Sequence, residues 1–164
     1  MNREEPSEPL ITALERLAES DDRAALAALR RSLSADATAQ AYPYVVPFFP
    51  RVSSPWTERA YLLVAGLFAL HPMMGAASLA AALRRVRDTT GSPSIEQRFV
   101  ALLDAHPEDL GGHLRHAVAL VRSHDTPIDW HNLLGTIRYW NESARRDWAR
   151  DFWGGASPDE GETT

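Results

Sequence analysis

Three kinds of side chain in this sequence could do chemistry: histidines at metal-ligand spacing, paired carboxylates, and arginines. Asp109, His113 and His116 stand at positions i, i+4 and i+7, which places them on one helical face and makes a metal site geometrically possible. A fourth ligand would have to come from elsewhere, such as His106 or His124. Because scattered surface histidines explain the same spacing, we expect no metal site.

The carboxylates that could act in acid–base catalysis each have a structural role. Glu108 and Asp109 open an expected helix, where acidic groups stabilise the helix dipole, and Asp125 and Asp129 flank another helix start. The sequence contains no GxGxxG, Walker, GxSxG or HExxH motif, and it has no cysteine for disulfides or thiolate metal sites. We therefore expect no catalytic residue and no cofactor.

Arginine supplies every basic side chain, because the chain has no lysine. A GC-rich genome explains this bias, but guanidinium groups also suit bidentate contacts with phosphate, and both explanations can hold. The arginines recur in pairs at helix ends and outer faces. From helix faces alone we select Arg84, Arg122 and Arg145 as candidate nucleic-acid contacts, although ordinary solvated surface is the simpler explanation of the pattern.

The net charge of −5 argues at first against a nucleic-acid partner, but the acids are unevenly placed. Without residues 1–9 and 154–164, which we expect to be disordered acidic tails, the chain carries equal numbers of acidic and basic residues. Basic groups can therefore cluster locally. The longest apolar run, residues 60–70, is too short to span a membrane, and the N-terminus has no apolar signal core. A cytoplasmic protein is the simplest interpretation.

The apolar spacing predicts an all-α fold of two small packed helical bundles in one compact chain. No stretch alternates with the period of a strand. Expected helices cover residues 22–33, 55–71, 76–87 and 143–153, and others begin at 94, 107 and 126. The stretch 42–55 is too rich in proline for a long helix. The segment 88–93 is the best boundary, which gives an N-terminal lobe over 10–90 and a C-terminal lobe over 91–153.

Five stretches, taken in order, resemble one known family. They are RAALAALRRSL (23–33), YLLVAGLFALHP (61–72), SIEQRFVALLDAHPEDLGGHLRHAVAL (94–120), PIDWHNLLGTIRYW (127–140) and RRDWARDFW (145–153). Together they resemble the CasB family, the small subunit of the type I-E CRISPR surveillance complex, Cascade. Each stretch is moderately specific, whereas the ordered set is highly specific and covers most of the chain between the tails.

The resemblance implies a non-catalytic protein that helps hold the displaced strand of the target DNA and so stabilises the R-loop. It implies as partners the backbone and large subunits of Cascade, a second copy of the chain, the CRISPR RNA and the target DNA. Family basic positions match Arg30 or Arg31, Arg98 and Arg115. The chain departs from some relatives at His116 and Asp104, where those relatives carry a basic group.

Two other functions remain open at this stage. One is a helical adaptor whose arginines contact only protein carboxylates. The other is a metalloenzyme built on the histidine and aspartate side chains of residues 109–116.

Overall fold

Most of the described part of the chain is helical. The structure, a computed structural model, describes residues 8–154. The elements in chain order are α1 (Pro9–Glu19), α2 (Arg23–Arg31), the 3₁₀ helix η1 (Ala35–Ala41), α3 (Tyr42–Val45), the 3₁₀ helix η2 (Val46–Phe48), α4 (Pro55–Leu70), α5 (Leu79–Thr90), α6 (Pro93–Asp104), α7 (Leu110–Ser123), α8 (Trp130–Arg138) and α9 (Glu142–Trp153). Within residues 8–154 no strand forms, and the predicted all-α fold is confirmed.

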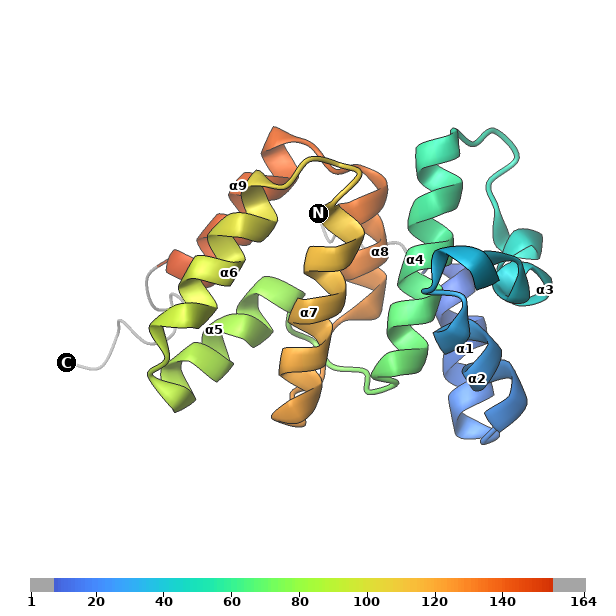
Figure 1. The fold of residues 1–164 in the computed structure, drawn as a ribbon, viewed down its shortest axis with the longest axis horizontal. Helices are drawn as coiled ribbons and strands as arrows, with labels where there is room; N and C mark the ends of the chain where they lie inside the picture. The colour runs from blue at the N-terminus through green and yellow to red at the C-terminus, as the bar shows by residue number, and fades with distance from the viewer. Residues whose placement is uncertain (1–7, 155–164) are drawn as a thin grey trace, which may run out of the picture.

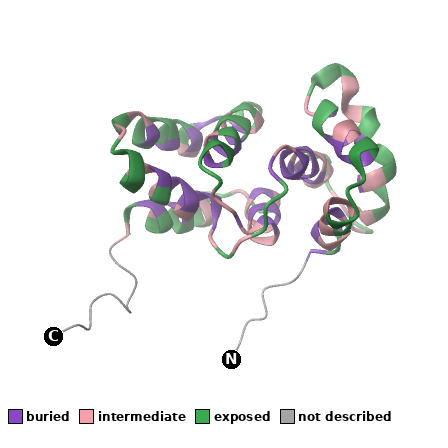
Figure 2. Cartoon of the chain, turned by 90° about the horizontal axis from the view of Figure 1, so that it is seen from below, coloured by how far each residue is buried: buried purple, intermediate pink, exposed green. Residues whose placement is uncertain are grey.

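Helix α4 lies in the middle of the molecule (Figure 1). It packs against α1 and α2 on one side and against α7 and α8 on the other. Its sequence explains this position, because residues 60–70 are almost entirely apolar and the helix is buried over most of its circumference. The burial colouring shows the same arrangement, with buried residues turned toward the spaces between helices (Figure 2).

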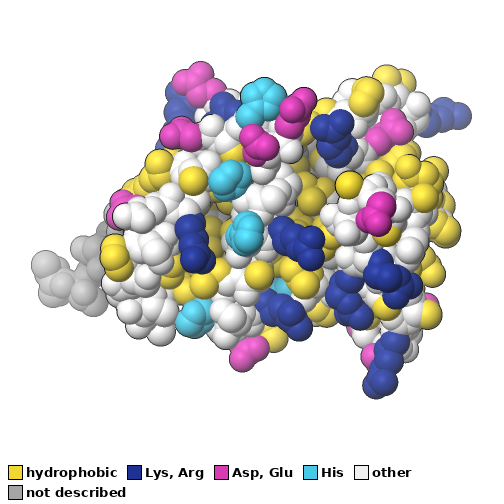
Figure 3. Space-filling model, in the orientation of Figure 1, with side chains coloured by type: hydrophobic (Ala, Val, Ile, Leu, Met, Phe, Trp, Pro, Cys, Tyr) yellow, Lys and Arg dark blue, Asp and Glu magenta, His cyan; other side chains and the backbone are white. Residues whose placement is uncertain are grey.

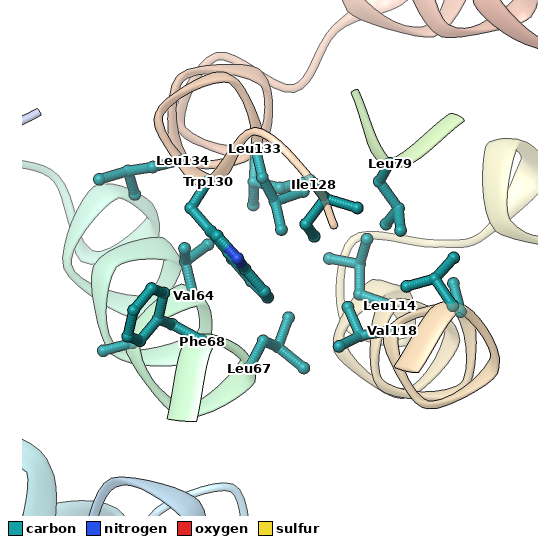
Figure 4. Close-up of a cluster of buried hydrophobic side chains, with 14 of the residues drawn as sticks. Val64, Leu67, Phe68, Leu79, Leu114, Val118, Ile128, Trp130, Leu133 and Leu134 are labelled. Carbon is teal, nitrogen blue, oxygen red and sulfur yellow. The ribbon is translucent and has the colours of Figure 1, made fainter. Parts of the chain in front are cut away.

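A continuous apolar core joins α4 to the C-terminal helices (Figure 4). The side chain of Trp130 is fully buried beside Phe68, with ring centroids 5.5 Å apart in an edge-to-face arrangement. The indole Nε1 of Trp130 donates a hydrogen bond to the carbonyl of Met73 at 3.2 Å. Leu114 and Val118 extend this core into α7.

Helix α5 contacts mainly C-terminal helices, namely α6, α7 and α9. The division into two lobes between residues 90 and 91 stays a prediction. Helix α5 belongs to the predicted N-terminal lobe by sequence but packs against helices of the predicted C-terminal lobe. Gly91, with a φ of 66°, ends α5 in the left-handed conformation that glycine adopts without strain.

Two helix starts differ from the predicted positions. The start at 126 is wrong: Asp129 caps α8, with its side chain accepting a hydrogen bond from the backbone N–H of Asn132 at 3.0 Å. Residues just before it are extended, because Ile128 exchanges backbone hydrogen bonds with Met73 and Gly75. Helix α7 begins at Leu110 rather than 107, since residues 107–109 form a turn.

Two other starts also differ from the predicted positions, one later and one earlier in the chain. Ser78 caps α5 by accepting a hydrogen bond from Ala81 N–H, so the helix covers 79–90 rather than 76–87. Helix α6 begins at Pro93, a residue suited to the first helical position, so the predicted cap at Ser94 lies inside the helix. The Ser94 hydroxyl instead pairs with that of Ser92 at 2.8 Å.

The predicted tails lie mostly outside the described residues. At the inner edge of the N-terminal one, Glu8 and Pro9 are part of the folded structure. Pro9 opens α1, and Glu8 is buried with its backbone N–H donating to Nδ1 of His131 at 2.9 Å. Residues 8 and 9, which the charge pattern assigned to the tail, therefore belong to the fold.

Candidate nucleic-acid interface

Three of the predicted arginines meet at one surface hollow, although they are far apart in sequence. Arg30 and Arg31 come from the last turn of α2, and Arg115 comes from α7. Together with Ser34, Asp36 and Ala37 of the adjacent segment they line a hollow of about 320 Å³, which we call the arginine hollow. All three arginine side chains are exposed.

Neighbouring groups orient two of these guanidinium groups. Nη1 of Arg30 donates to the carbonyl of Ala69 at 3.3 Å, at the end of α4 where helix carbonyls lack helical partners. Nε of Arg31 donates to Oε1 of Gln40 at 2.8 Å. Since a guanidinium has five N–H donors, each group keeps donors for an anion. Arg30 and Arg31 are thus each oriented by one hydrogen bond, and their other N–H donors can still contact an anion.

Within residues 8–154 none of Arg30, Arg31 and Arg115 forms an ion pair. The carboxyl-bearing residue Asp36 lines the hollow beside them and forms no ion pair with them either. The local charge of the hollow is therefore positive, in contrast to the negative net charge of the chain.

Arg98 lies at a second concavity, on the other side of α7. With His113 and His116 it lines a cavity of about 320 Å³ whose other walls are apolar. The cavity is bounded by residues of α5, α6 and α7, and we call it the α6–α7 cavity. Arg98 and His116 are exposed and His113 is half-buried. Arg98 is thus a surface residue, whereas its neighbour Phe99 is buried in the core.

Arg122 is exposed in the last turn of α7, one heptad after Arg115. Seven residues are close to two helical turns, so the two side chains leave the helix on the same face. In the described part of the chain neither Arg98 nor Arg122 takes part in an ion pair. Five of the seven predicted arginines therefore remain available to an external anion.

The other two predicted arginines are engaged within the protein. Nε of Arg84 lies 3.9 Å from the carboxylate of Asp88, one turn later on α5, and its side chain is 32% exposed. The guanidinium of Arg145 lies over the ring of Trp140, 5.4 Å from the centroid, and its Nε is buried. Neither residue lines the arginine hollow or the α6–α7 cavity.

Arginine and histidine side chains gather on one face of the molecule, across α6, α7 and α2 (Figure 3). We call this the basic face and define it by Arg30, Arg31, Arg98, Arg115, Arg122, His113 and His116. Sequence reasoning found its arginines, but it considered the two histidines only as possible metal ligands with Asp109 and expected no site there. Among the residues that the structure describes, no three metal-ligating side chains come together, and these histidines border an apolar cavity.

Comparison with known proteins identifies the family. The family model for the CRISPR-associated protein Cse2 matches residues 25–153. A relative named CRISPR-associated protein Cse2, from Thermus thermophilus, is 40% identical over an alignment of 146 residues that covers 84% of this chain and 83% of that protein. The chain belongs to the Cse2 family. The resemblance inferred from the five sequence stretches is thereby confirmed, since solved members of the family also carry the name CasB.

Solved structures share the fold of this Cse2-family chain. The crystal structure of CasB from Thermus thermophilus has a TM-score of 0.78 and 35% identity, covering 92% of this chain and 99% of that one. A chain of a CRISPR RNA-guided surveillance complex has a TM-score of 0.77 and 26% identity, covering 89% of this chain and 90% of that one. The basic face is thus built on the complete fold of the Cse2 family.

Proposed function

We propose that this protein is the non-catalytic small subunit of a type I-E Cascade complex and that its basic face holds the displaced DNA strand. The observation that carries the proposal is the arginine hollow, where α2 and α7 bring three exposed arginines together, none of them in an ion pair with any group of residues 8–154. A surface that gathers its basic groups while the whole chain is negative is suited to a polyanion.

The chemistry of the basic face favours contact with the DNA backbone over reading of sequence. Guanidinium groups bind phosphate through paired, charge-assisted hydrogen bonds. A displaced single strand requires a positive track and planar groups for stacking, which arginine and histidine provide. In RNA-guided complexes the pairing of guide and target supplies sequence specificity. Holding the displaced strand then opposes closure of the duplex and stabilises the R-loop.

Assembly explains how a negatively charged chain can contribute to DNA binding. Placed beside the strand by other subunits, the basic face meets DNA at a high effective concentration, so weak contacts add measurably to retention. The proposed partners are the backbone and large subunits of Cascade, a second copy of this chain, the CRISPR RNA and the target DNA. The relative within a CRISPR RNA-guided surveillance complex supports this assignment.

The proposed place of action is the cytoplasm, where target DNA is encountered. Among the helices of residues 8–154, none has both the length and the apolar character needed to cross a bilayer.

Retention of target DNA by the assembled complex tests the proposal. We expect Arg30→Ala, Arg98→Ala and Arg115→Ala each to speed dissociation of the DNA, because each removes a phosphate contact. Arg150→Ala is the control, since Arg150 is also exposed but pairs with Asp147 at 2.8 Å on α9. A helical adaptor without nucleic-acid contacts predicts unchanged retention in all four variants, which would refute the proposed function.

A further inference from the structure

The α6–α7 cavity combines an apolar interior with a basic rim. Its floor is formed by buried residues of three helices, Leu83, Ile95, Phe99, Leu102 and Ala117. Arg98, His113 and His116 supply its polar lining, and none of its lining residues is acidic. Its volume of about 320 Å³ lies within the range of small-ligand sites, roughly 300–1,000 Å³.

The cavity and the arginine hollow are neighbours across α7. Arg115 lines the hollow and His116 lines the cavity, and consecutive residues of a helix point about 100° apart. Both residues are exposed, so the ridge of α7 between the two concavities is open to a ligand. An occupant that spans α7 would place a negative group near Arg115 and an apolar group in the cavity.

We propose that the α6–α7 cavity accepts one nucleobase turned out from the single strand held by the basic face. A nucleotide carries the two chemistries that the neighbouring sites require: a phosphate for the guanidinium groups and a planar base for an apolar cavity with imidazoles at its rim. This inference rests on the proposed function and adds to it a defined site for a base, in addition to contacts with the backbone.

The proposed site predicts that a strand with bases binds better than a strand without them, whichever base occupies the cavity. An apolar cavity can take the faces of any base, whereas base-edge recognition would require a fixed set of hydrogen-bonding groups. The rim offers Arg98, His113 and His116, which are long or rotatable polar side chains rather than a fixed pattern. The complex should therefore bind the displaced strand with similar affinity whatever its base sequence.

The test compares two target duplexes in the assembled complex. One carries an ordinary, base-bearing displaced strand, and the other carries a displaced strand with a run of abasic sites, which keeps the phosphates and removes the bases. Both displaced strands are mismatched to the target strand, so neither duplex can close. With the wild-type chain, we expect the ordinary DNA to dissociate roughly five-fold or more slowly, because stacking of one base contributes at least about that factor.

Ala117→Leu fills the cavity from its floor, where Ala117 is 9% exposed, and leaves every arginine in place. We expect this variant to release the ordinary DNA as fast as wild type releases the abasic DNA, with the abasic rate unchanged. Val100→Leu, on the exposed side of α6 that faces away from the cavity, is the control for added side-chain volume and should behave as wild type. Ala101→Leu, at the exposed cavity wall, replaces Ala117→Leu if that variant fails to fold.

Each contrary outcome has a distinct meaning. Equal dissociation of both DNAs from the wild-type complex, or a preference that survives Ala117→Leu, would overturn the base site while leaving the backbone contacts intact. Loss of a folded Ala117→Leu chain from the complex, with the Val100→Leu chain retained, would overturn the base site in favour of a neighbouring subunit's apolar side chain in the cavity. By contrast, the proposed function would be refuted if Arg115→Ala left the dissociation rates of both the ordinary and the abasic DNA unchanged.

Discussion

Removing the three arginine side chains of the arginine hollow should lower the salt dependence of DNA binding by a calculable amount. The variant is Arg30→Ala, Arg31→Ala and Arg115→Ala combined. Each exposed guanidinium without an ion pair can neutralise one phosphate and release the counterion condensed on it. For single strands the slope of log K against log salt changes by about 0.7 per phosphate, so three contacts correspond to a change of about 2.

This change in slope is large enough to measure. Between 50 and 200 mM salt, the wild-type complex should lose roughly 20-fold more affinity than the triple variant loses over the same range. The assay is equilibrium binding of labelled target DNA to the assembled complex at several salt concentrations. The comparison between variants isolates the contribution of this chain, because all other subunits are unchanged.

Arg150→Ala controls for the loss of one positive charge away from the arginine hollow. Arg150 is 71% exposed and pairs with Asp147, so its removal should leave the slope as in wild type. Parallel salt dependences for the triple variant and the wild type would refute the reasoning, because they would mean that no phosphate lies at the hollow. If Arg150→Ala lowered the slope as much per charge as the triple variant does, the effect would come from the overall charge of the chain and not from phosphate contacts at the arginine hollow.

Further predictions concern the fold and can be measured by chemical denaturation of the purified chain. Trp130→Ala removes a fully buried side chain and should lower the free energy of unfolding by about 3–5 kcal/mol. Gly66→Ala would place a methyl group 2.6 Å from the side chain of Leu33 and should cost about 1–3 kcal/mol. Gly112→Ala, in a helix with nothing within 4 Å of the added methyl group, should instead stabilise by about 0.5–1 kcal/mol; destabilisation would contradict the open site. Ser78→Ala removes a helix cap and should cost about 1 kcal/mol, and an unchanged midpoint would show that the cap is dispensable.

Local sequence signals predicted most of the fold because they act over one or two turns. The cap and first-position proline at Ser54 and Pro55 fix the start of α4 where expected, and the all-apolar run after them fixes its burial. The start of α8 could not be located as well. Its position depends on backbone hydrogen bonds of Ile128 with Met73 and Gly75, which are distant in sequence and leave no local pattern.

The candidate site was predictable in its residue types but not in its assembly. Helix periodicity shows that Arg115 is on an outer face, but the meeting with Arg30 and Arg31 depends on how α2 and α7 pack around α4. The surroundings of Arg145 could not be predicted for the same reason. A helical wheel places it on an outer face, but the packing of the chain brings its guanidinium over the ring of Trp140. Arg84 could have been recognised from its i, i+4 spacing to Asp88, which is a local signal.

The most direct test of the central claim is to find which molecule lies against the arginine hollow in the working complex. Because the chain has no cysteine, a single Ser34→Cys substitution gives a unique attachment point for a photo-crosslinker at the hollow. Ser143→Cys, an exposed position at a separate pocket formed by α8 and α9, is the matched control. On target binding and irradiation, we expect the displaced strand to crosslink to position 34 and not to position 143. Crosslinks from position 34 to protein alone, or equal DNA crosslinking from both positions, would contradict the claim that the displaced strand lies at the arginine hollow.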